Sequence, residues 1–279
     1  MDERRAFAVV TPNLNMGQYL GKTIESVLRN LRPGDQYFVV DGGSIDNSTE
    51  IIQSYSKYLT GWISEPDHGY ADAIAKGFEG TQSHYLCWIN SGDLLLDGAL
   101  DMARKHLEDT EVDFIFGDDV YIDKAGQIIH FSNGSIRSLR NAMLYGGWTP
   151  LQDACFWRRD LYERVGGISR ELKYAADFDL FLRFAIEGRY KYVNATFSAF
   201  RQHESQKSIA GNHNYALERA HCRRRELQKF GGFGFQSLLM EAWYWFSVRC
   251  KAHFQTRVPP GQRYRGSPVE LLRSEPYER

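Results

Sequence analysis

VVDGGSIDNSTEI, residues 39–51, places an acidic residue at the end of an apolar run and two glycines directly after it. Asp and Gly are common in turns, so a plain turn at Asp41, Gly42 and Gly43 is one interpretation. A ligand site is the other, because open α/β sheets bind ligands at the carboxyl ends of their strands. The sequence on either side of this stretch discriminates between the two.

Strand-like and helix-like segments alternate through the first half of the chain. A short buried strand is expected at residues 7–10, and Leu20, Ile24 and Val27 then recur at helical spacing. Further strands are expected within residues 36–43, 62–63 and 84–93, and helices within residues 17–31, 48–58, 69–77 and 98–107. This alternation predicts an α/β fold with a mostly parallel, doubly wound sheet.

The second half of the chain departs from this alternation. Two strand-like segments flank the tripeptide KAG at residues 124–126, which predicts a hairpin and therefore antiparallel strands. A helix is expected with Phe178 and Phe181 on its apolar face, and a late strand and a polar helix follow it. We expect one sheet domain over residues 1–230 and a helical C-terminal tail over residues 231–279.

The tail is rich in aromatic and basic residues. FQSLLMEAWYWFSVRCKAHF, residues 235–254, suits an amphipathic helix lying on an anionic membrane surface. A helix docked on the sheet domain or in a dimer interface explains the same pattern equally well. The last dozen residues are expected to be disordered.

The composition is ordinary for a globular protein, with 43% apolar and 25% charged residues. A net charge of −1 argues against nucleic-acid binding by bulk electrostatics, so no nucleic-acid partner is expected. The four cysteines are too scattered for a disulfide framework or a structural zinc site. Neither a signal peptide nor an apolar run of transmembrane length is visible. We therefore expect a cytoplasmic protein, located at the inner face of the membrane if the tail binds lipid.

Three strands of the first half end in polar clusters. These are Thr11-Pro12-Asn13, Asp41-Gly42-Gly43 and Asn90-Ser91-Gly92-Asp93. Because parallel strands end along one edge of a sheet, the clusters should converge on one crevice, which favours a ligand site over separate turns. The chain has neither a GxGxxG after its first strand nor a P-loop pattern, which disfavours dinucleotide enzymes and P-loop NTPases. Asp41 could bind a base or ribose, and Asp93 could bind a divalent cation beside phosphates.

Five segments of the chain resemble the family 2 inverting glycosyltransferases and stand in that family's order. They are VVTPNLNMGQYLGKTIESVL (9–28), VVDGGSIDNSTEII (39–52), SEPDHGYADAIAKGF (64–78), WINSGDLLLDGAL (88–100) and AADFDLFLRF (175–184). The resemblance covers residue 6 to about residue 205 and is strongest with bacterial members that build capsule, O-antigen and exopolysaccharide. It implies the GT-A nucleotide-sugar fold. It also implies transfer from a nucleoside-diphosphate sugar, with a UDP-sugar favoured, to a saccharide or lipid-linked acceptor.

The resemblance further implies roles for individual residues. The base and ribose would be lined by Thr11, Pro12, Asn13, Asp41, Gly42 and Ser44, and the diphosphate would lie beside Asp67, Asp72 and Lys76. The glycines after Asp41 would let the backbone approach the nucleotide. Asp93 of NSGD, aided by Asn90, would hold Mn²⁺ or Mg²⁺, and His203 would be a further metal or diphosphate ligand.

Asp177 matches the position of the family's general base. Such a base takes the proton of the acceptor hydroxyl while a nucleoside diphosphate leaves from the opposite side of the anomeric carbon. Lys76 and a divalent cation would stabilise the charge of the leaving group. Asp179 lies two residues further along the same helix and points elsewhere, where it would cap the helix or position a neighbour on the acceptor side.

Further polar and aromatic residues are candidates for the acceptor pocket. Trp148 could stack on a sugar face, although core packing is the alternative, and Gln152 and Asp153 could line the same pocket. Asp118 and Asp119 are adjacent on a strand and turn to opposite faces. We therefore interpret this pair as strand-end residues rather than as metal ligands.

Two other functions stay open. A nucleotidyltransferase would need a phosphate loop rich in glycine and basic residues near the N-terminus, and TPNLNMGQYL, residues 11–20, lacks one. A non-catalytic nucleotide-sugar-binding protein of the same fold would be consistent with Gly92, Ala75 and Ala176. These three replace the Asp, Asn and Glu that are common in the family.

Overall fold

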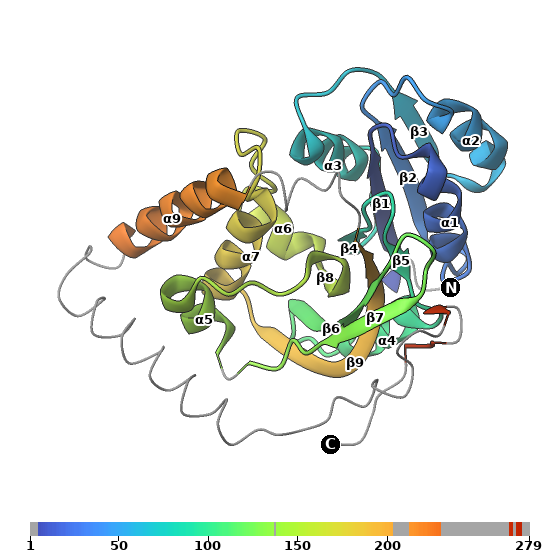
Figure 1. Ribbon diagram of the computed structural model, residues 1–279. Helices are drawn as coiled ribbons and strands as arrows, with labels where there is room; N and C mark the ends of the chain where they lie inside the picture. Colours follow the sequence, from blue (N-terminus) through green and yellow to red (C-terminus); the bar gives the residue numbers. More distant parts are fainter. Residues whose placement is uncertain (1–4, 137, 203–211, 230–267, 270–271, 275–279) are drawn as a thin grey trace.

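The computed structural model of the chain describes residues 5–136, 138–202, 212–229, 268–269 and 272–274 (Figure 1). Its strands are β1 (Phe7–Asn13), β2 (Gln36–Asp41), β3 (Gly61–Ser64), β4 (Tyr85–Trp88), β5 (Leu94–Leu95), β6 (Phe114–Ile122), β7 (Ile128–Ser132), β8 (Cys155–Arg158) and β9 (Tyr190–Arg201). Its α-helices are α1 (Gly17–Leu28), α2 (Ser48–Tyr55), α3 (Tyr70–Glu79), α4 (Ala99–Leu107), α5 (Leu139–Gly146), α6 (Arg159–Arg164), α7 (Ala176–Glu187) and α9 (Asn212–Lys229).

The strands form one mixed sheet in the order β3-β2-β1-β4-β8-β6-β9-β5, with β7 paired to β6. β1 runs parallel to β2 and β4, and β2 runs parallel to β3, as the alternating pattern predicts. The hairpin at residues 124–126 is confirmed by the antiparallel pairing of β6 with β7. β8 enters antiparallel between β4 and β6, and β9 returns parallel to β6. No local pattern in the sequence predicts β5, β8, α5 or α6.

The first half assembles around β1, which is buried along its whole length. A central strand covered by helices on both faces has no polar side, which explains its continuous apolar run. In Figure 1, α1 and α2 lie on one side of this part of the sheet and α3 lies on the other. A Cβ on Gly77 of α3 would come within 2.4 Å of Val10, so α3 packs directly on β1.

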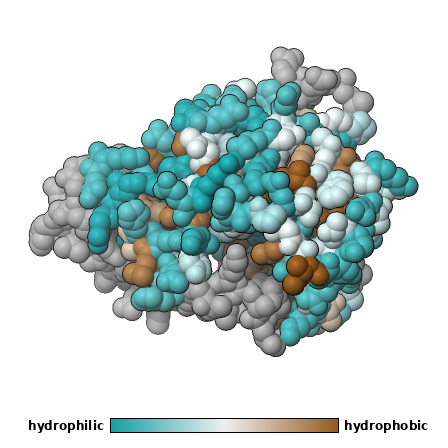
Figure 2. Space-filling model, turned by 90° about the horizontal axis from the view of Figure 1, so that it is seen from above, coloured by the Kyte–Doolittle hydropathy of each residue, from teal (hydrophilic) through white to brown (hydrophobic). Residues whose placement is uncertain are grey.

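The described surface, seen from above the view of Figure 1, is mostly hydrophilic with small separate hydrophobic patches (Figure 2). The most exposed large apolar side chain is Ile45, at 93%, and Leu14 is 48% exposed. These two residues lie in the loops that follow β2 and β1. The backbone N–H of Ile45 donates to Asn15 Oδ1 at 2.8 Å, which joins the two loops.

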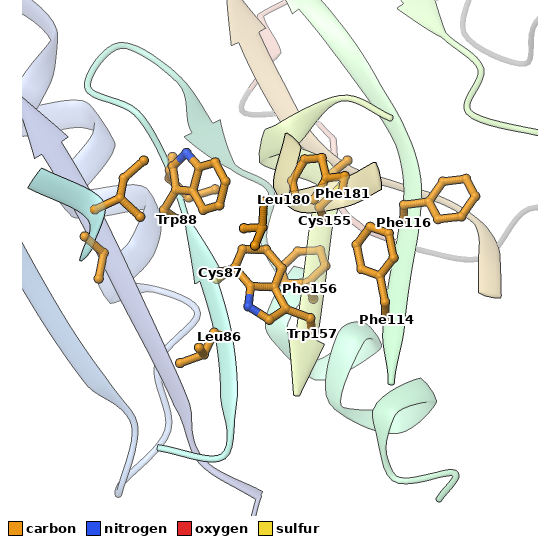
Figure 3. Close-up of a cluster of buried hydrophobic side chains, with 14 of the residues drawn as sticks. Leu86, Cys87, Trp88, Phe114, Phe116, Cys155, Phe156, Trp157, Leu180 and Phe181 are labelled. Carbon is orange, nitrogen blue, oxygen red and sulfur yellow. The ribbon is translucent and has the colours of Figure 1, made fainter. Parts of the chain in front are cut away.

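An aromatic cluster holds α7 against the second half of the sheet (Figure 3). Phe181 of α7 stacks on Trp88 of β4, with ring centroids 5.7 Å apart, and on Phe114 of β6 at 5.5 Å. Trp157 of β8 meets the same ring edge-on at 6.0 Å. Phe178 is also fully buried, so the predicted apolar face of this helix is confirmed. Close packing of this kind leaves α7 little freedom to slide over the strands.

The chain end departs from the predicted disorder at the residues that the structure describes. Val269 is 2% exposed, and its backbone N–H donates to the carbonyl oxygen of Gly126 at 3.1 Å. It covers a second apolar cluster beside the sheet, formed by Leu94, Leu96, Val120, Ile122, Ile128 and Ala199. Burial of that apolar surface stabilises the contact between Val269 and the sheet. The predicted amphipathic segment, residues 235–254, lies outside the described residues.

Candidate active site

The ends of β1, β2 and β4 meet, as the sequence predicts. The carbonyl oxygen of Pro12 accepts hydrogen bonds from the backbone N–H of Ser91 at 3.3 Å and from its hydroxyl at 3.1 Å. The backbone N–H of Gly42 donates to the carbonyl oxygen of Asn13 at 2.8 Å. These bonds join the three polar clusters along one edge of the sheet.

Asp41 lies fully buried in the middle of this edge. One carboxylate oxygen accepts from Asn13 Nδ2 at 2.6 Å and from Ser44 Oγ at 2.5 Å. The other accepts from the backbone N–H of Ser44 at 2.9 Å and from Ser64 Oγ at 2.7 Å. Burial by itself would raise the pKa of Asp41, but these donors outweigh it and lower the pKa below its ordinary value. With four donors, this carboxylate serves first to fasten the strand ends together.

Asn13 and Thr11 have different surroundings on the same strand. Asn13 is 3% exposed, and its Oδ1 atom has no hydrogen-bond partner within the described residues, which leaves it an available acceptor beside Asp41. Thr11 is fully buried, and its hydroxyl is 2.9 Å from the hydroxyl of Tyr37 inside the sheet. The Thr11 hydroxyl therefore has the internal partner that a buried hydroxyl needs, and the contact between Thr11 and a nucleotide stays a prediction.

The two glycines after Asp41 have a reason other than the predicted approach of a nucleotide. A Cβ on Gly42 would come within 2.6 Å of a carboxylate oxygen of Asp67. Gly43 has a φ of +81°, and a Cβ there would lie 3.1 Å from the backbone nitrogen of Pro66. The glycines therefore let one loop close onto another, and the left-handed backbone at Gly43 favours glycine in any case. Asp67 in turn accepts from the backbone N–H of Gly69 at 2.8 Å.

Lys76 and Asp72 lie on α3, and both contact other protein groups. Lys76 Nζ is 2.8 Å from a carboxylate oxygen of Glu65 and 3.4 Å from Asp72. Asp72 is 3% exposed and also lies 3.5 Å from Arg170. Burial would raise the pKa of Asp72, but the backbone N–H of His68 and the charge of Lys76 lower it overall. Lys76 would have to exchange Glu65 for a phosphate to act as predicted.

Gln152 links the second half of the chain to the end of β4. Its Nε2 donates to the carbonyl oxygen of Trp88 at 2.6 Å, and its Oε1 accepts from Asn90 Nδ2 at 2.6 Å. Trp148 is partly buried, and its ring packs edge-on against Phe116 with centroids 6.2 Å apart. Gln152 thus holds Asn90 in place, while Trp148 makes at least one packing contact with the core.

Asp93, Asp119 and Asp153 are neighbouring buried carboxylates, and none is more than 4% exposed. Burial, followed by the charge of Asp153, raises the pKa of both Asp93 and Asp119 well above the ordinary value. Burial also raises the pKa of Asp153 to about 6. In the described part of the chain, both oxygens of Asp119 and Oδ2 of Asp153 have no hydrogen-bond partner. We refer to these three residues as the carboxylate cluster.

The sequence interpretation of Asp118 and Asp119 was right in one respect and wrong in another. The two do turn apart, since Asp118 Oδ1 accepts from the hydroxyl of Tyr192 at 2.8 Å while Asp119 joins the carboxylate cluster. They lie in the middle of β6 and not at its end. The pairing of β6 with β9 shifts register at these two residues. The sequence did contain a sign that these acids matter, since two acids stand inside an apolar strand and a buried charge needs a partner or a function.

The chemistry of the carboxylate cluster suits a divalent cation held jointly with a substrate. Mg²⁺ and Mn²⁺ prefer oxygen ligands and commonly bind through one or two carboxylates plus substrate phosphates. Asp93 Oδ1 accepts from the backbone N–H of Arg201 at 2.9 Å. Within the residues described, no three His, Cys, Asp or Glu side chains are arranged to hold a metal by themselves. His203 lies outside the described residues. Diphosphate oxygens of a bound donor would add ligands to those of the carboxylate cluster.

Asp177 is the second residue of α7, and its Oδ1 atom is buried without a hydrogen-bond partner among the residues that the structure describes. Burial raises the pKa of Asp177 to about 6, although nearby backbone N–H groups and the charge of Arg219 act in the opposite direction. An available carboxylate oxygen with a pKa near neutrality is the chemistry that a general base requires.

Asp179 does not have the predicted acceptor-side position. It is fully buried, with one carboxylate oxygen 2.6 Å from Arg183 and the other 2.6 Å from Arg225. A buried carboxylate is costly unless it is paired, and here the pairing joins α7 to α9. The residue stabilises the fold next to Asp177 and has no surface with which to contact an acceptor.

Comparison with known sequences gives a family match and several distant relatives. Residues 8–166, more than half of the chain, match Glycosyl transferase family 2. The PGL/p-HBAD biosynthesis glycosyltransferase of Mycobacterium bovis (strain BCG / Pasteur 1173P2) is 24% identical over 197 residues, which is 67% of this chain and 74% of that protein. Glycosyltransferase GlyG of Streptococcus pneumoniae serotype 4 is 24% identical over 127 residues, 44% of this chain and 42% of GlyG. Chondroitin synthase of Pasteurella multocida is 21% identical over 196 residues, which is 67% of this chain but 20% of the synthase. The chain therefore matches less than half of the length of GlyG and of chondroitin synthase.

Comparison with solved structures confirms the predicted GT-A fold. S. aureus TarS 1–349 in complex with UDP-GlcNAc has a TM-score of 0.66 at 14% identity, covering 92% of this chain and 77% of that one. The mannosyltransferase PcManGT from Pyrobaculum calidifontis in complex with GDP-Man and Mn²⁺ has a TM-score of 0.58 at 12% identity, with the same coverages. No helix within the described residues has both the length and the apolar character needed to cross a bilayer.

Proposed function

The chain belongs to glycosyl transferase family 2, and on that premise we propose that it is an inverting, metal-dependent glycosyltransferase. Its donor would be a nucleoside-diphosphate sugar, with a UDP-sugar favoured. Its acceptor would be a saccharide or a lipid-linked saccharide of a bacterial surface polysaccharide. The observation that carries the proposal is Asp177, whose Oδ1 atom is buried without a hydrogen-bond partner among the described residues, on a helix that contacts the donor-side helix α3.

The reaction that these residues support is an in-line displacement. The oxygen of the acceptor hydroxyl forms a bond to the anomeric carbon, and Asp177 takes the hydroxyl proton. The bond between that carbon and the diphosphate oxygen breaks, and the electron pair leaves with the nucleoside diphosphate. One carboxylate is enough, because the leaving diphosphate needs no protonation when its charge is neutralised.

The donor would lie at the strand ends where β1, β2 and β4 meet. Asn13 Oδ1, buried and available beside Asp41, would accept a hydrogen bond from the base, and Lys76 would turn from Glu65 to the diphosphate. Asp93 would hold a divalent cation that, when bound, neutralises charge on the diphosphate. The TarS complex with UDP-GlcNAc supports a uridine nucleotide, and the PcManGT complex makes GDP the first alternative to test.

A non-catalytic nucleotide-sugar-binding protein of the same fold is the second candidate. It is favoured by Gly92, which replaces an acidic residue of the commoner metal motif and has a φ of +114° that suits glycine. In that case nucleotide would bind and no sugar would be transferred. The cytoplasmic location and the membrane contact of the tail stay predictions.

The test is calorimetric titration of the protein with UDP, GDP and dTDP, with and without Mn²⁺. The variant Asp93→Asn keeps an oxygen acceptor for the Arg201 N–H and removes the charge that a cation needs. The matched control is Asp97→Asn, four residues along, whose exposed carboxylate pairs with Arg29 at 2.9 Å.

We expect one nucleotide to bind, more tightly with Mn²⁺, and we expect the metal effect to disappear in Asp93→Asn and persist in Asp97→Asn. If the nucleotide affinity of the unaltered protein is the same with and without Mn²⁺, the metal is removed from the proposal. No binding of any of the three nucleotides would overturn it.

A further inference from the structure

The helix that carries Asp177 begins without a cap of its own. Ala175 occupies the N-cap position of α7 and Ala176 follows it, and neither has a polar side chain. The first N–H groups of a helix have no partner inside the helix, and Ser, Thr, Asp or Asn at the N-cap usually supplies one. In this chain the partners of the Ala175 and Ala176 N–H groups come from two other helices.

Glu218 of α9 binds the N-cap residue Ala175 and the two residues before it. Its carboxylate accepts from the backbone N–H groups of Lys173 at 3.2 Å, Tyr174 at 2.9 Å and Ala175 at 2.8 Å. A negative charge at this end of a helix is also favoured by the helix dipole. Glu218 therefore fixes the segment that leads directly into Asp177.

Tyr70 of α3 completes the set from the donor side. Its hydroxyl accepts from the backbone N–H of Ala176 at 2.8 Å and donates to the carbonyl oxygen of Tyr174 at 3.2 Å. Burial, followed by the charge of Asp177, raises the pKa of Tyr70, so the hydroxyl stays neutral and keeps its proton. These two hydrogen bonds thus tie the start of α7 to the start of α3.

Helix α9 is itself anchored, which makes Glu218 a fixed cap. Arg225 pairs with Asp179 at 2.6 Å, one helical turn beyond Ala175. Arg223 donates to the carbonyl oxygens of Leu144 at 2.6 Å and Tyr145 at 3.1 Å, at the end of α5. Helix α9 therefore contacts Ala175, two residues before Asp177, and Asp179, two residues after it.

We propose that Glu218, together with Tyr70, is a positioning residue that caps α7 from outside and sets the place of Asp177 relative to the donor. This inference rests on the proposed role of Asp177 as the base. It makes the geometry of transfer depend on the docking of α9, although Glu218 touches neither donor nor acceptor in the proposed reaction.

The position also predicts an effect on proton affinity. The titratable and charged groups around Asp177 are Tyr70 from α3, Cys155 from β8, and Tyr215, Glu218 and Arg219 from α9. The charge of Glu218 raises the pKa of Asp177, and the charge of Arg219 lowers it. Neutralising Glu218 should therefore move the acidic limb of the kcat profile to lower pH.

The experiment compares Glu218→Ala, Glu218→Gln and Asp177→Asn in the full chain, with kcat, donor affinity and amide hydrogen exchange as readouts. Glu218→Ala should lose roughly 10-fold to 100-fold in kcat, because small misplacements of a reacting group are costly, and donor Kd should change by less than about twofold. Glu218→Gln keeps an acceptor oxygen, so it should recover much of kcat and show the shifted pH profile. Exchange at the amides of Lys173, Tyr174 and Ala175 should accelerate in Glu218→Ala.

The matched control is Glu226→Ala on the same helix. The Glu226 carboxylate is 2.8 Å from both Arg225 and Lys229, so its loss weakens α9 without touching the cap. An equal loss of kcat in Glu226→Ala would mean that the effect comes from α9 as a whole, and would overturn the assignment to Glu218. Unchanged kcat and unchanged exchange in Glu218→Ala, with Asp177→Asn inactive, would overturn the inference alone. Full activity in Asp177→Asn would instead overturn the proposed function.

Discussion

Asp41 at the end of β2 and the acids of the carboxylate cluster are similarly buried, but their surroundings are opposite. Asp41 and Asp119 are both fully buried. Four donors contact Asp41 and lower its pKa, whereas Asp119 has no hydrogen-bond partner within the described chain and a strongly raised pKa. Asp177 resembles Asp119, with an under-paired oxygen and a pKa of about 6.

The difference teaches that burial by itself does not mark a functional acid. A carboxylate that the protein satisfies completely acts as part of the structure, and Asp41 fastens three strand ends together. A carboxylate that the protein buries without donors costs stability, and it can take up a proton or a cation at low cost. The same substitution should therefore have opposite effects in the two regions.

Replacing Asp41 by Asn should give the largest change in stability. The amide loses the negative charge and turns an N–H group toward the hydroxyls of Ser44 and Ser64 or toward Asn13. We expect a loss of about 3 kcal/mol in the free energy of unfolding at pH 7, measured by urea denaturation. Because the folded-state pKa is lowered, this contribution is present above the ordinary pKa and disappears as the pH falls through the folded value. An Asp41→Asn variant as stable as the unaltered chain at pH 7 would break the comparison.

Replacing Asp177 by Asn should stabilise the chain. The pKa is raised from 3.8 to about 6, so ionising Asp177 in the folded state costs free energy that is absent below pH 4 and complete above about pH 6. Because the residue keeps some exposed surface, we expect a gain of about 2 kcal/mol at pH 8, shrinking as the pH falls toward 4. The check is urea denaturation at both pH values. A gain that does not depend on pH would show that the ionised carboxylate is not its source.

Replacing Gly92 by Ala should change the stability less than the two substitutions above. It tests whether the glycine of the metal motif is required by its backbone conformation. A φ of +114° strains any side chain, so we expect a loss of about 1 kcal/mol, with an unchanged nucleotide preference. Gly21→Ala is the control, since a Cβ there meets only ordinary contacts at 4.0 Å within helix α1, and it should be neutral or slightly stabilising. Thermal denaturation of both variants provides the measurement. Equal losses in the two would contradict a backbone origin.

The sequence predicted what depends on local patterns. Buried strands, the apolar face of α7 and the polar strand ends all follow from periodicity and from the parallel alternation. The resemblance then indicated Asp177, whose Oδ1 atom is buried without a hydrogen-bond partner among the described residues and whose pKa is raised to about 6. Motif matching could not show that Tyr37 is the partner of Thr11, or that Arg183 and Arg225 pair with Asp179.

The remainder depends on contacts between segments far apart in the sequence. Strand β8 lies antiparallel between β4 and β6, and no local sequence pattern predicts this position. The carboxylate cluster brings together acids from three separate segments, so its electrostatics appear only in the fold. The cap of α7 is similar, since Glu218 lies 43 positions from Ala175. Two alanines where a helix start normally has a capping residue were the local sign that a cap had to come from elsewhere.

The central claim, that Asp177 is the base of sugar transfer, is tested most directly by the pH dependence of kcat for the unaltered chain and for Asp177→Asn. We predict that kcat of the unaltered chain falls as the pH drops through about 6, where Asp177 becomes protonated. We predict that Asp177→Asn loses roughly 10²-fold to 10⁴-fold in kcat at every pH while still binding the donor. A profile of the unaltered chain that stays flat down to pH 5, or an Asp177→Asn variant that keeps its rate, would contradict the account.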